Sequence, residues 1–198
     1  MIDTVFDFFR AGGWVMYPLL MMSVLGLAAV LERCFFWTRF STRRELRAFR
    51  KYADLIDAND PSSLIAASTN DSSPVGRLVL WAGTRRDPSE EAVLANIELI
   101  RPSLESRNAF LSVVVGAAPL LGILGTVVGI IESFDLLGQA ASVSDPTIVA
   151  GGIAEALYTT AAGLTIALLA LFPSVYFKQR ANACLGRLET LGAMLASK

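Results

Sequence analysis

The chain has 198 residues, 54% of them hydrophobic and only 18% charged, with a formal net charge of −1. A water-soluble domain of this size normally carries more charge, so the composition indicates a membrane protein. The sequence contains no histidine and no C-x-x-C pair. This excludes a metal site built on imidazole or paired thiolates, and we expect no metal and no other cofactor.

Three segments lack any charged residue, and each is long enough to cross a bilayer. These segments are Ala11–Leu31, Ala109–Ile131 and Ala156–Phe177. A helix needs roughly 20 apolar residues to cross a hydrocarbon core of about 30 Å. We therefore expect an all-α membrane protein with three transmembrane helices, at residues 14–37, 109–132 and 155–177.

The first apolar segment could instead belong to a cleaved signal peptide. Signal peptides begin with a positively charged region, whereas this chain begins with Asp3 and Asp7 against a single Arg10. The segment is also longer than a typical signal core, and Glu32-Arg33 follows it in place of a small-residue cleavage site. These features favour a retained membrane anchor.

Basic residues are distributed unevenly around the spans. Twelve of the seventeen Lys and Arg lie between Arg33 and Arg107, four follow the third span, and residues 133–154 contain none. The positive-inside rule places the basic segments in the cytoplasm. It predicts an outer N-terminus at residues 1–13, a cytoplasmic helical segment at 38–108, an outer loop at 133–154 and a cytoplasmic C-terminal helix at 178–198.

Helix signals fill the cytoplasmic segment. Ser41 can cap a helix over Thr42–Asp57, which Asn59-Asp60-Pro61 ends. After a loop at residues 68–74, we expect a short amphipathic helix over Val75–Gly83. A further helix begins with an acidic cap at Asp87, followed by Pro88 in its first turn.

The last cytoplasmic helix continues towards span two. Its apolar residues recur at spacings of four, three and four, which forms one helical face. They are Val93, Ile97, Ile100 and Leu104. No strong breaker follows, so we expect one helix over residues 88–133. Span three continues in the same way through Ala181, Leu185, Leu188 and Leu195. Long amphipathic extensions need partners, so the chain is expected to self-associate.

Small residues form a stripe along one face of each of the last two spans. On span two they are Ser112, Gly116, Pro119, Gly122, Thr126, Gly129 and Ser133, and on span three Ala156, Thr160, Gly163, Ala167, Ala170 and Ser174. Gly125-x-x-x-Gly129 is a close-packing pattern of membrane helices. The stripes indicate either tight helix–helix contact or a narrow path lined by threonine hydroxyls, and periodicity does not separate these two.

Glu155 stands at the outer edge of span three. It is either a carboxylate stabilised by the positive end of the helix dipole and wetted by the outer loop, or a port for protons or cations. The sequence alone leaves both interpretations open.

Spans two and three each carry a motif rich in glycine and threonine. Span two contains Gly125-Thr126-Val127-Val128-Gly129-Ile130. Span three contains Gly152-Ile153-Ala154-Glu155-Ala156-Leu157, followed by Thr159-Thr160-Ala161-Ala162-Gly163-Leu164. With Ala118-Pro119-Leu120-Leu121-Gly122 and Glu32-Arg33, these motifs resemble the MotA/TolQ/ExbB proton channel family over essentially the whole chain. Three spans resemble the TolQ/ExbB branch, because MotA-like stators have four.

The resemblance implies a proton-channel subunit of a bacterial inner membrane, with a periplasmic N-terminus and a cytoplasmic C-terminus. ExbB-like proteins form a homo-oligomeric ring, a pentamer, around single-span subunits of the ExbD or TolR type. The transmembrane aspartate of those subunits takes and releases the proton. A TonB-like protein and membrane lipid are further expected partners, and nucleic acid is not.

The resemblance also assigns roles to residues of this chain. Thr126 and Thr160 become pore-facing hydroxyls, and Glu155 the acidic residue of the proton pathway. The residues expected to line the pore or pack the helices are Pro119, Gly122, Gly125, Gly129, Ala156, Gly163 and Ala167. The three uncharged segments contain no carboxylate, which fits a chain whose partner supplies the titrating acid.

The leading hypothesis is an ExbB-like subunit that couples the proton-motive force to TonB-type outer-membrane uptake. The alternative within the family is a TolQ-like role in envelope integrity or constriction. An alternative of another class is a non-conducting membrane scaffold that uses the stripes only for packing. An intramembrane enzyme is not expected, because no histidine can activate a serine and no pair of intramembrane aspartates is present.

Overall fold

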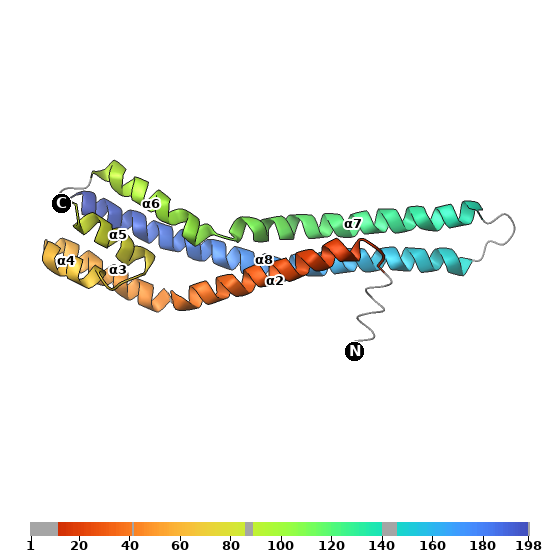
Figure 1. The fold of residues 1–198 in the computed structure, drawn as a ribbon, viewed down its shortest axis with the longest axis horizontal. Helices are drawn as coiled ribbons and strands as arrows, with labels where there is room; N and C mark the ends of the chain where they lie inside the picture. The colour runs from red at the N-terminus through yellow and green to blue at the C-terminus, as the bar shows by residue number, and fades with distance from the viewer. Residues whose placement is uncertain (1–11, 41, 86–88, 140–145, 198) are drawn as a thin grey trace. The chain divides into compact units, whose positions relative to one another are not determined.

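A computed structural model describes residues 12–40, 42–85, 89–139 and 146–197. All regular structure in these residues is helical, which confirms the all-α class. The helices are α2 (Met16–Arg39), α3 (Thr42–Asp57), α4 (Pro61–Ser68), α5 (Pro74–Gly83), α6 (Glu90–Glu105), α7 (Asn108–Gln139) and α8 (Pro146–Ala196) (Figure 1).

Three of these helices are long and apolar enough to cross a membrane, as the sequence predicts. The candidate spans are Met16–Thr38, Asn108–Asp135 and Ala150–Ala196. Helix α7 continues to Gln139 and α8 begins at Pro146, so both helices extend into residues 133–154, where the sequence predicts an outer loop. The expected cap residues Ser41 and Asp87 lie outside the described residues.

The chain divides into two compact units. One, the span unit, comprises Met1–Leu31 and Arg107–Val175, and the other, the polar unit, comprises Glu32–Ser106 and Tyr176–Lys198. The helices α2 and α8 each contribute residues to both units.

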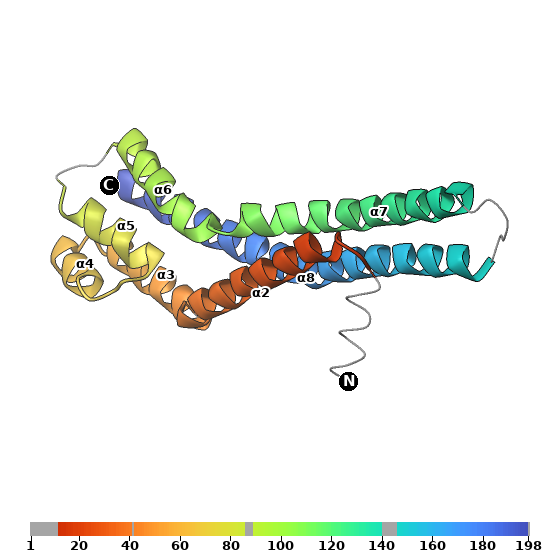
Figure 2. The ribbon, with the colours of Figure 1, turned by 45° about the vertical axis from the view of Figure 1, so that its right-hand side comes forward.

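In the span unit, α7 runs antiparallel beside the first part of α8, and the first part of α2 packs against the pair (Figures 1 and 2). One core cluster joins all three helices: Val15, Met16, Leu19, Ala118 and Ala167. Large apolar side chains on the other faces are exposed, as expected for side chains that meet lipid or neighbouring chains. They include Leu124, Ile131, Leu164, Leu168 and Phe172.

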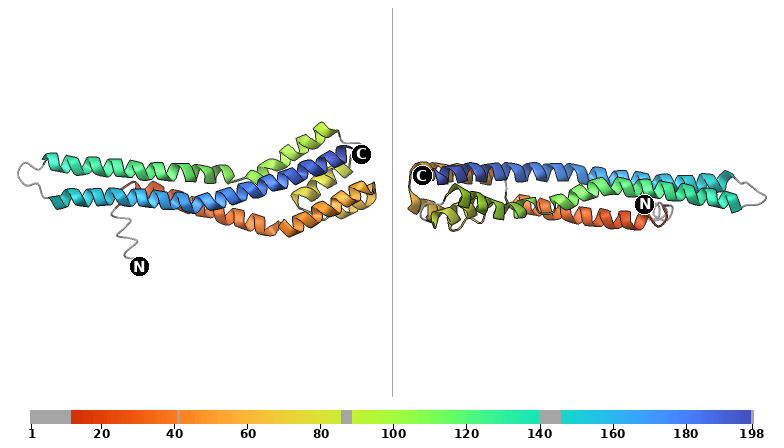
Figure 3. Two further views of the ribbon diagram at one scale, coloured as in Figure 1. Left: turned by 180° about the vertical axis from the view of Figure 1, so that it is seen from behind. Right: turned by 90° about the horizontal axis from the view of Figure 1, so that it is seen from above.

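In the polar unit, α3, α4 and α5 pack on one another, and α5 contacts α6. The α6 helix lies along the C-terminal part of α8 (Figure 3). A side-chain carbon added to Gly192 of α8 would meet Val93 and Ile97 of α6. The predicted apolar face of α6 is buried, with Val93, Ile97, Ile100 and Leu104 each at most 3% exposed.

The predicted single helix over residues 88–133 is wrong. It is broken at Ser106 and Arg107, and Arg107 has a φ of +63°, in the left-handed region. No glycine or proline marks this break, which falls where the polar unit gives way to the span unit. The continuation of span three is confirmed, because α8 is one helix of 51 residues.

Two local features also differ from the sequence prediction. The helix cap of α6 is Ser89, whose hydroxyl accepts a hydrogen bond from the Ala92 amide at 3.3 Å. The second feature is Asp60, which the sequence assigns only to the end of the preceding helix. Its carboxylate caps α4 by accepting from the Ser63 amide at 3.1 Å, with Pro61 in the first turn.

Candidate functional site

The contact between α7 and α8 is built from residues with little or no side chain. A side-chain carbon added to Gly122 would lie 2.9 Å from the Thr159 carbonyl oxygen, and one added to Gly129 would lie 2.9 Å from the Ala156 side chain. Such a carbon at Gly125 would overlap the Thr159 side chain, and one at Gly163 the carbonyl of Ala118. The two backbones are therefore closer than larger side chains would permit.

This close approach gathers three threonine hydroxyls around one backbone carbonyl. The Gly122 oxygen accepts hydrogen bonds from Thr160 Oγ1 at 3.0 Å and Thr159 Oγ1 at 3.1 Å, both from the facing helix. Thr126 Oγ1 lies 3.4 Å from the same oxygen and 3.1 Å from Thr160 Oγ1. A side chain at position 122 would hold α8 away from this oxygen, so glycine is what makes the cluster possible.

The three hydroxyls differ in access. Thr159 is 2% exposed, and its hydroxyl also donates to the Ala156 carbonyl at 2.7 Å. Thr126 and Thr160 are half-buried. The pair predicted from the sequence thus lies at the edge of the helix contact, with its hydroxyls in direct contact with each other. The interhelical hydrogen bonding expected from the packing interpretation is present.

Thr159 is the site residue that the sequence reasoning missed. It lies three residues after Ala156 and four before Gly163, so it shares their helical face. That spacing was a sufficient signal for its place on the packed side. The hydrogen bond from Thr159 to the Gly122 carbonyl could not be predicted from the pattern of side chains, because its acceptor is a backbone oxygen.

Glu155 lies one residue before Ala156 of this contact and is half-buried. Together with Glu132, Gly125 and Thr159 it lines a small cavity of about 20 Å³. A polar cavity of that size has room for a single water molecule. The geometry therefore places Glu155 and one member of the threonine cluster, Thr159, at the same small cavity.

The other predicted lining residues are divided between two environments. Ala156 and Gly163 are buried against α7, and Gly125 is buried and Gly129 half-buried against α8. Ala167 is buried in the cluster with Val15, Met16 and Leu19, which makes it a packing residue against α2. Pro119 is half-buried inside α7. Gly116, on the same predicted stripe, borders open space.

Nothing in the described part of the chain resembles a metal centre, since no three Cys, Asp or Glu side chains there lie together as ligands would. The available chemistry is a carboxylate, hydroxyls and a backbone carbonyl within an apolar helix pair. These groups can orient water and exchange hydrogen bonds, and they supply no nucleophile–base pair.

The fold and site define a membrane protein with three spans, two of which meet through glycine, alanine and threonine around a cluster of hydroxyls. A profile of the MotA/TolQ/ExbB proton channel family matches residues 61–190. The chain belongs to this family, in its ExbB/TolQ branch, and is a membrane-embedded subunit of a proton-channel motor.

Individual relatives support this assignment. The chain is 35% identical to biopolymer transport protein ExbB-like 1 of Synechocystis sp. over 174 residues, which are 83% of this chain and 67% of that protein. It is 30% identical to biopolymer transport protein exbB1 of Vibrio cholerae over 184 residues, 89% of this chain and 80% of that protein. Over 81 residues, 41% of this chain and 35% of that protein, it is 42% identical to the Tol-Pal system protein TolQ of Haemophilus influenzae.

Proposed function

We propose that this chain is an ExbB-like subunit, which couples the proton-motive force to a TonB-type system for outer-membrane uptake. Its copies form a ring, a pentamer, with a periplasmic N-terminus and a cytoplasmic C-terminus. The ring encloses a single-span subunit of the ExbD or TolR type. The observation that carries the proposal is the Thr126–Thr160 hydroxyl pair, 3.1 Å apart and half-buried, in a chain of a proton channel family.

In this proposal the chain provides the surroundings for a proton that another subunit carries. The threonine hydroxyls can donate to and accept from water or a carboxylate, but they do not titrate near neutral pH. A transmembrane aspartate of the partner takes and releases the proton beside them. Each proton that crosses 100 mV releases about 2.3 kcal/mol, which the ring converts into movement of the partner.

Glu155 is proposed as the outer port of this pathway. Its place beside the small cavity with Thr159 supports a role in delivering protons towards the hydroxyl cluster. Glu155→Ala should then impair proton-driven function more than ring assembly. If assembly alone fails in this variant, Glu155 is a helix-terminus carboxylate and not a port.

A TolQ-like role in envelope integrity or constriction is the second candidate. It is favoured by the 42% identity to a TolQ protein, although that match covers 41% of this chain. The two roles differ in the outer-membrane process that they support, and not in the chemistry proposed for the threonines.

The test is co-purification and complementation. The full chain, expressed with a candidate single-span subunit of the ExbD or TolR type that carries one membrane aspartate, should form a stable complex with it. It should restore TonB-dependent uptake in a strain that lacks its own ExbB-like subunit. Restoration of envelope integrity alone would favour the TolQ-like role, and absence of any single-span partner would favour a non-conducting scaffold.

A further inference from the structure

The first half of α3 carries an exposed face with positive charges only. Five basic residues occur within nine positions, and all of them are exposed: Arg43, Arg44, Arg47, Arg50 and Lys51. Arg43, Arg47 and Arg50 follow one another at spacings of four and three, which places them on one side of the helix. The proton-channel role proposed above does not use them.

No exposed acid interrupts this stretch. Its single acidic residue, Glu45, is 4% exposed, and its Oε1 accepts from Arg187 Nη2 at 2.9 Å and from Nε at 3.0 Å. Asp54 and Asp57 follow only in the second half of α3. The exposed positive charge is therefore concentrated at the end of α3 that comes first after the span.

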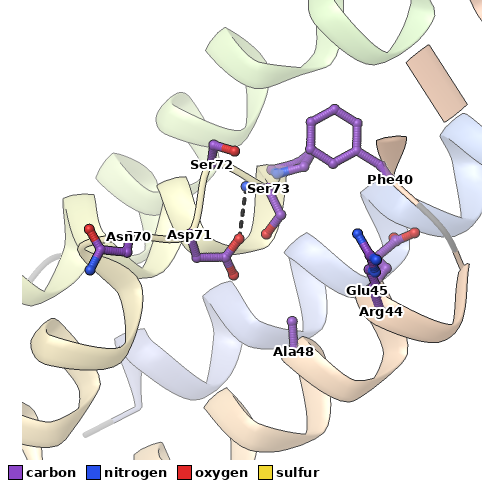
Figure 4. A pocket seen from close by; sticks show the side chains of 9 residues that line it. Phe40, Arg44, Glu45, Ala48, Asn70, Asp71, Ser72 and Ser73 are labelled. Atoms are coloured by element: carbon purple, nitrogen blue, oxygen red, sulfur yellow. Dashed lines mark hydrogen bonds between the residues drawn. The ribbon is translucent and has the colours of Figure 1, made fainter. Parts of the chain in front are cut away.

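The opposite side of α3 is anchored, which fixes the direction of the basic face. Besides the Glu45–Arg187 pair, the Tyr52 hydroxyl donates to Asp71 Oδ2 at 2.8 Å, and Ile56 is buried. Asp71 in turn accepts from the Ser73 amide at 2.9 Å (Figure 4). Rotating α3 about its axis to bury these arginines would break both the Glu45–Arg187 ion pair and the Tyr52–Asp71 hydrogen bond.

The basic face follows closely after the end of the first span. The candidate span ends at Thr38, so Arg43 comes five residues and Lys51 thirteen residues later. The linking chain spans at most about 3.6 Å per residue, so Arg43, the first residue of the basic face, lies within about 18 Å of Thr38. The headgroup layer together with one Debye length of about 8 Å covers most of that range.

We propose that the exposed face of Arg43, Arg44, Arg47, Arg50 and Lys51 binds anionic phospholipid headgroups of the membrane that the chain spans. Polybasic segments next to a span attract such lipids, by about five-fold in affinity for each charge near the surface. A role restricted to setting topology requires the charges during insertion only. A lipid site requires them on one exposed face of the folded protein, where they hold negatively charged lipids in preference to zwitterionic ones.

The purified full chain, reconstituted in an equal mixture of phosphatidylglycerol and phosphatidylcholine and extracted in mild detergent, provides the test. Mass spectrometry of the retained lipid should show enrichment of phosphatidylglycerol. Arg43→Gln with Arg47→Gln should reduce that enrichment, by up to about 30-fold for two charges. The matched control, Arg77→Gln with Arg85→Gln, removes two exposed charges, one from α5 and one just after its end, and should retain the enrichment.

A second measurement needs no variant. The enrichment of the unmodified chain should fall when salt is raised from about 0.05 to about 0.5 M, because screening weakens contacts between exposed charges. Equal retention of the two lipids by the unmodified chain would overturn the proposal and point to an acidic protein as the partner of α3. An equal loss in the α3 and α5 variants would overturn it too, since a general charge effect would then explain the result.

Discussion

Replacing Gly122 by alanine tests the close approach of α7 and α8. The added carbon would lie 2.9 Å from the Thr159 carbonyl oxygen and 3.0 Å from the Thr160 Cα. Both are backbone atoms, so relief requires the helices to separate. Overpacking of this kind costs about 1–3 kcal/mol. Weakening two interhelical hydroxyl bonds to the Gly122 oxygen adds about 0.6 kcal/mol each.

Gly116→Ala is the matched control, because the same atom added there would meet nothing within 4 Å. Any gain in helix propensity, about 1 kcal/mol in water, is common to both variants and cancels in the comparison. Unfolding of the purified chain by a titration with sodium dodecyl sulfate in mild detergent measures the difference. We expect Gly122→Ala to unfold at clearly lower denaturant than Gly116→Ala. Equal midpoints would refute the close-contact geometry.

Two further predictions concern the polar unit. Glu45→Ala should destabilise it by about 3–5 kcal/mol in thermal unfolding, because Arg187 loses its buried partner, and adding Arg187→Leu should recover part of that loss. An unchanged midpoint in Glu45→Ala would contradict the pair. Burial and the bond to Asp71 raise the pKa of Tyr52, so its stabilising contribution is present below pH of about 10 and is lost above it. Tyr52→Phe should therefore be less stable near neutral pH, by about 1–2 kcal/mol, and should lose less stability as the pH rises past 10. Parallel pH profiles for the two proteins would exclude this role of Tyr52.

The three spans were predictable because uncharged runs of this length have few alternatives. The buried face of α6 was predictable from its spacing, since Val93, Ile97, Ile100 and Leu104 repeat with the period of a helix. The break at Arg107 was not, because its left-handed backbone occurs without a glycine or proline. The start of α4 was missed although Asp60-Pro61 carried its signal, because the same residues also end α3.

The candidate site was predictable in composition but not in its hydrogen bonds. Small-residue spacing brought out Gly122, Thr126 and Thr160 as members of facing stripes. It gave no information on which backbone carbonyl the hydroxyls would reach, because that depends on how deeply the two helices approach. Thr159 and Thr160 are adjacent in the chain, so both lie near the contact, and only the packing determines which of them is fully buried.

The most direct test of the proton-pathway proposal is proton flux through a ring that contains Thr160→Val. The substitution keeps the shape of the side chain and removes a hydroxyl whose interhelical bonds contribute about 0.6 kcal/mol, at most about 1.7. The complex should therefore still assemble. Vesicles containing the chain and its single-span partner, loaded with a pH-sensitive dye under an imposed potential, measure the flux. We predict that Thr160→Val abolishes the flux and that Thr160→Ser retains it. Full flux in Thr160→Val would contradict the pathway and leave the threonines with a packing role alone.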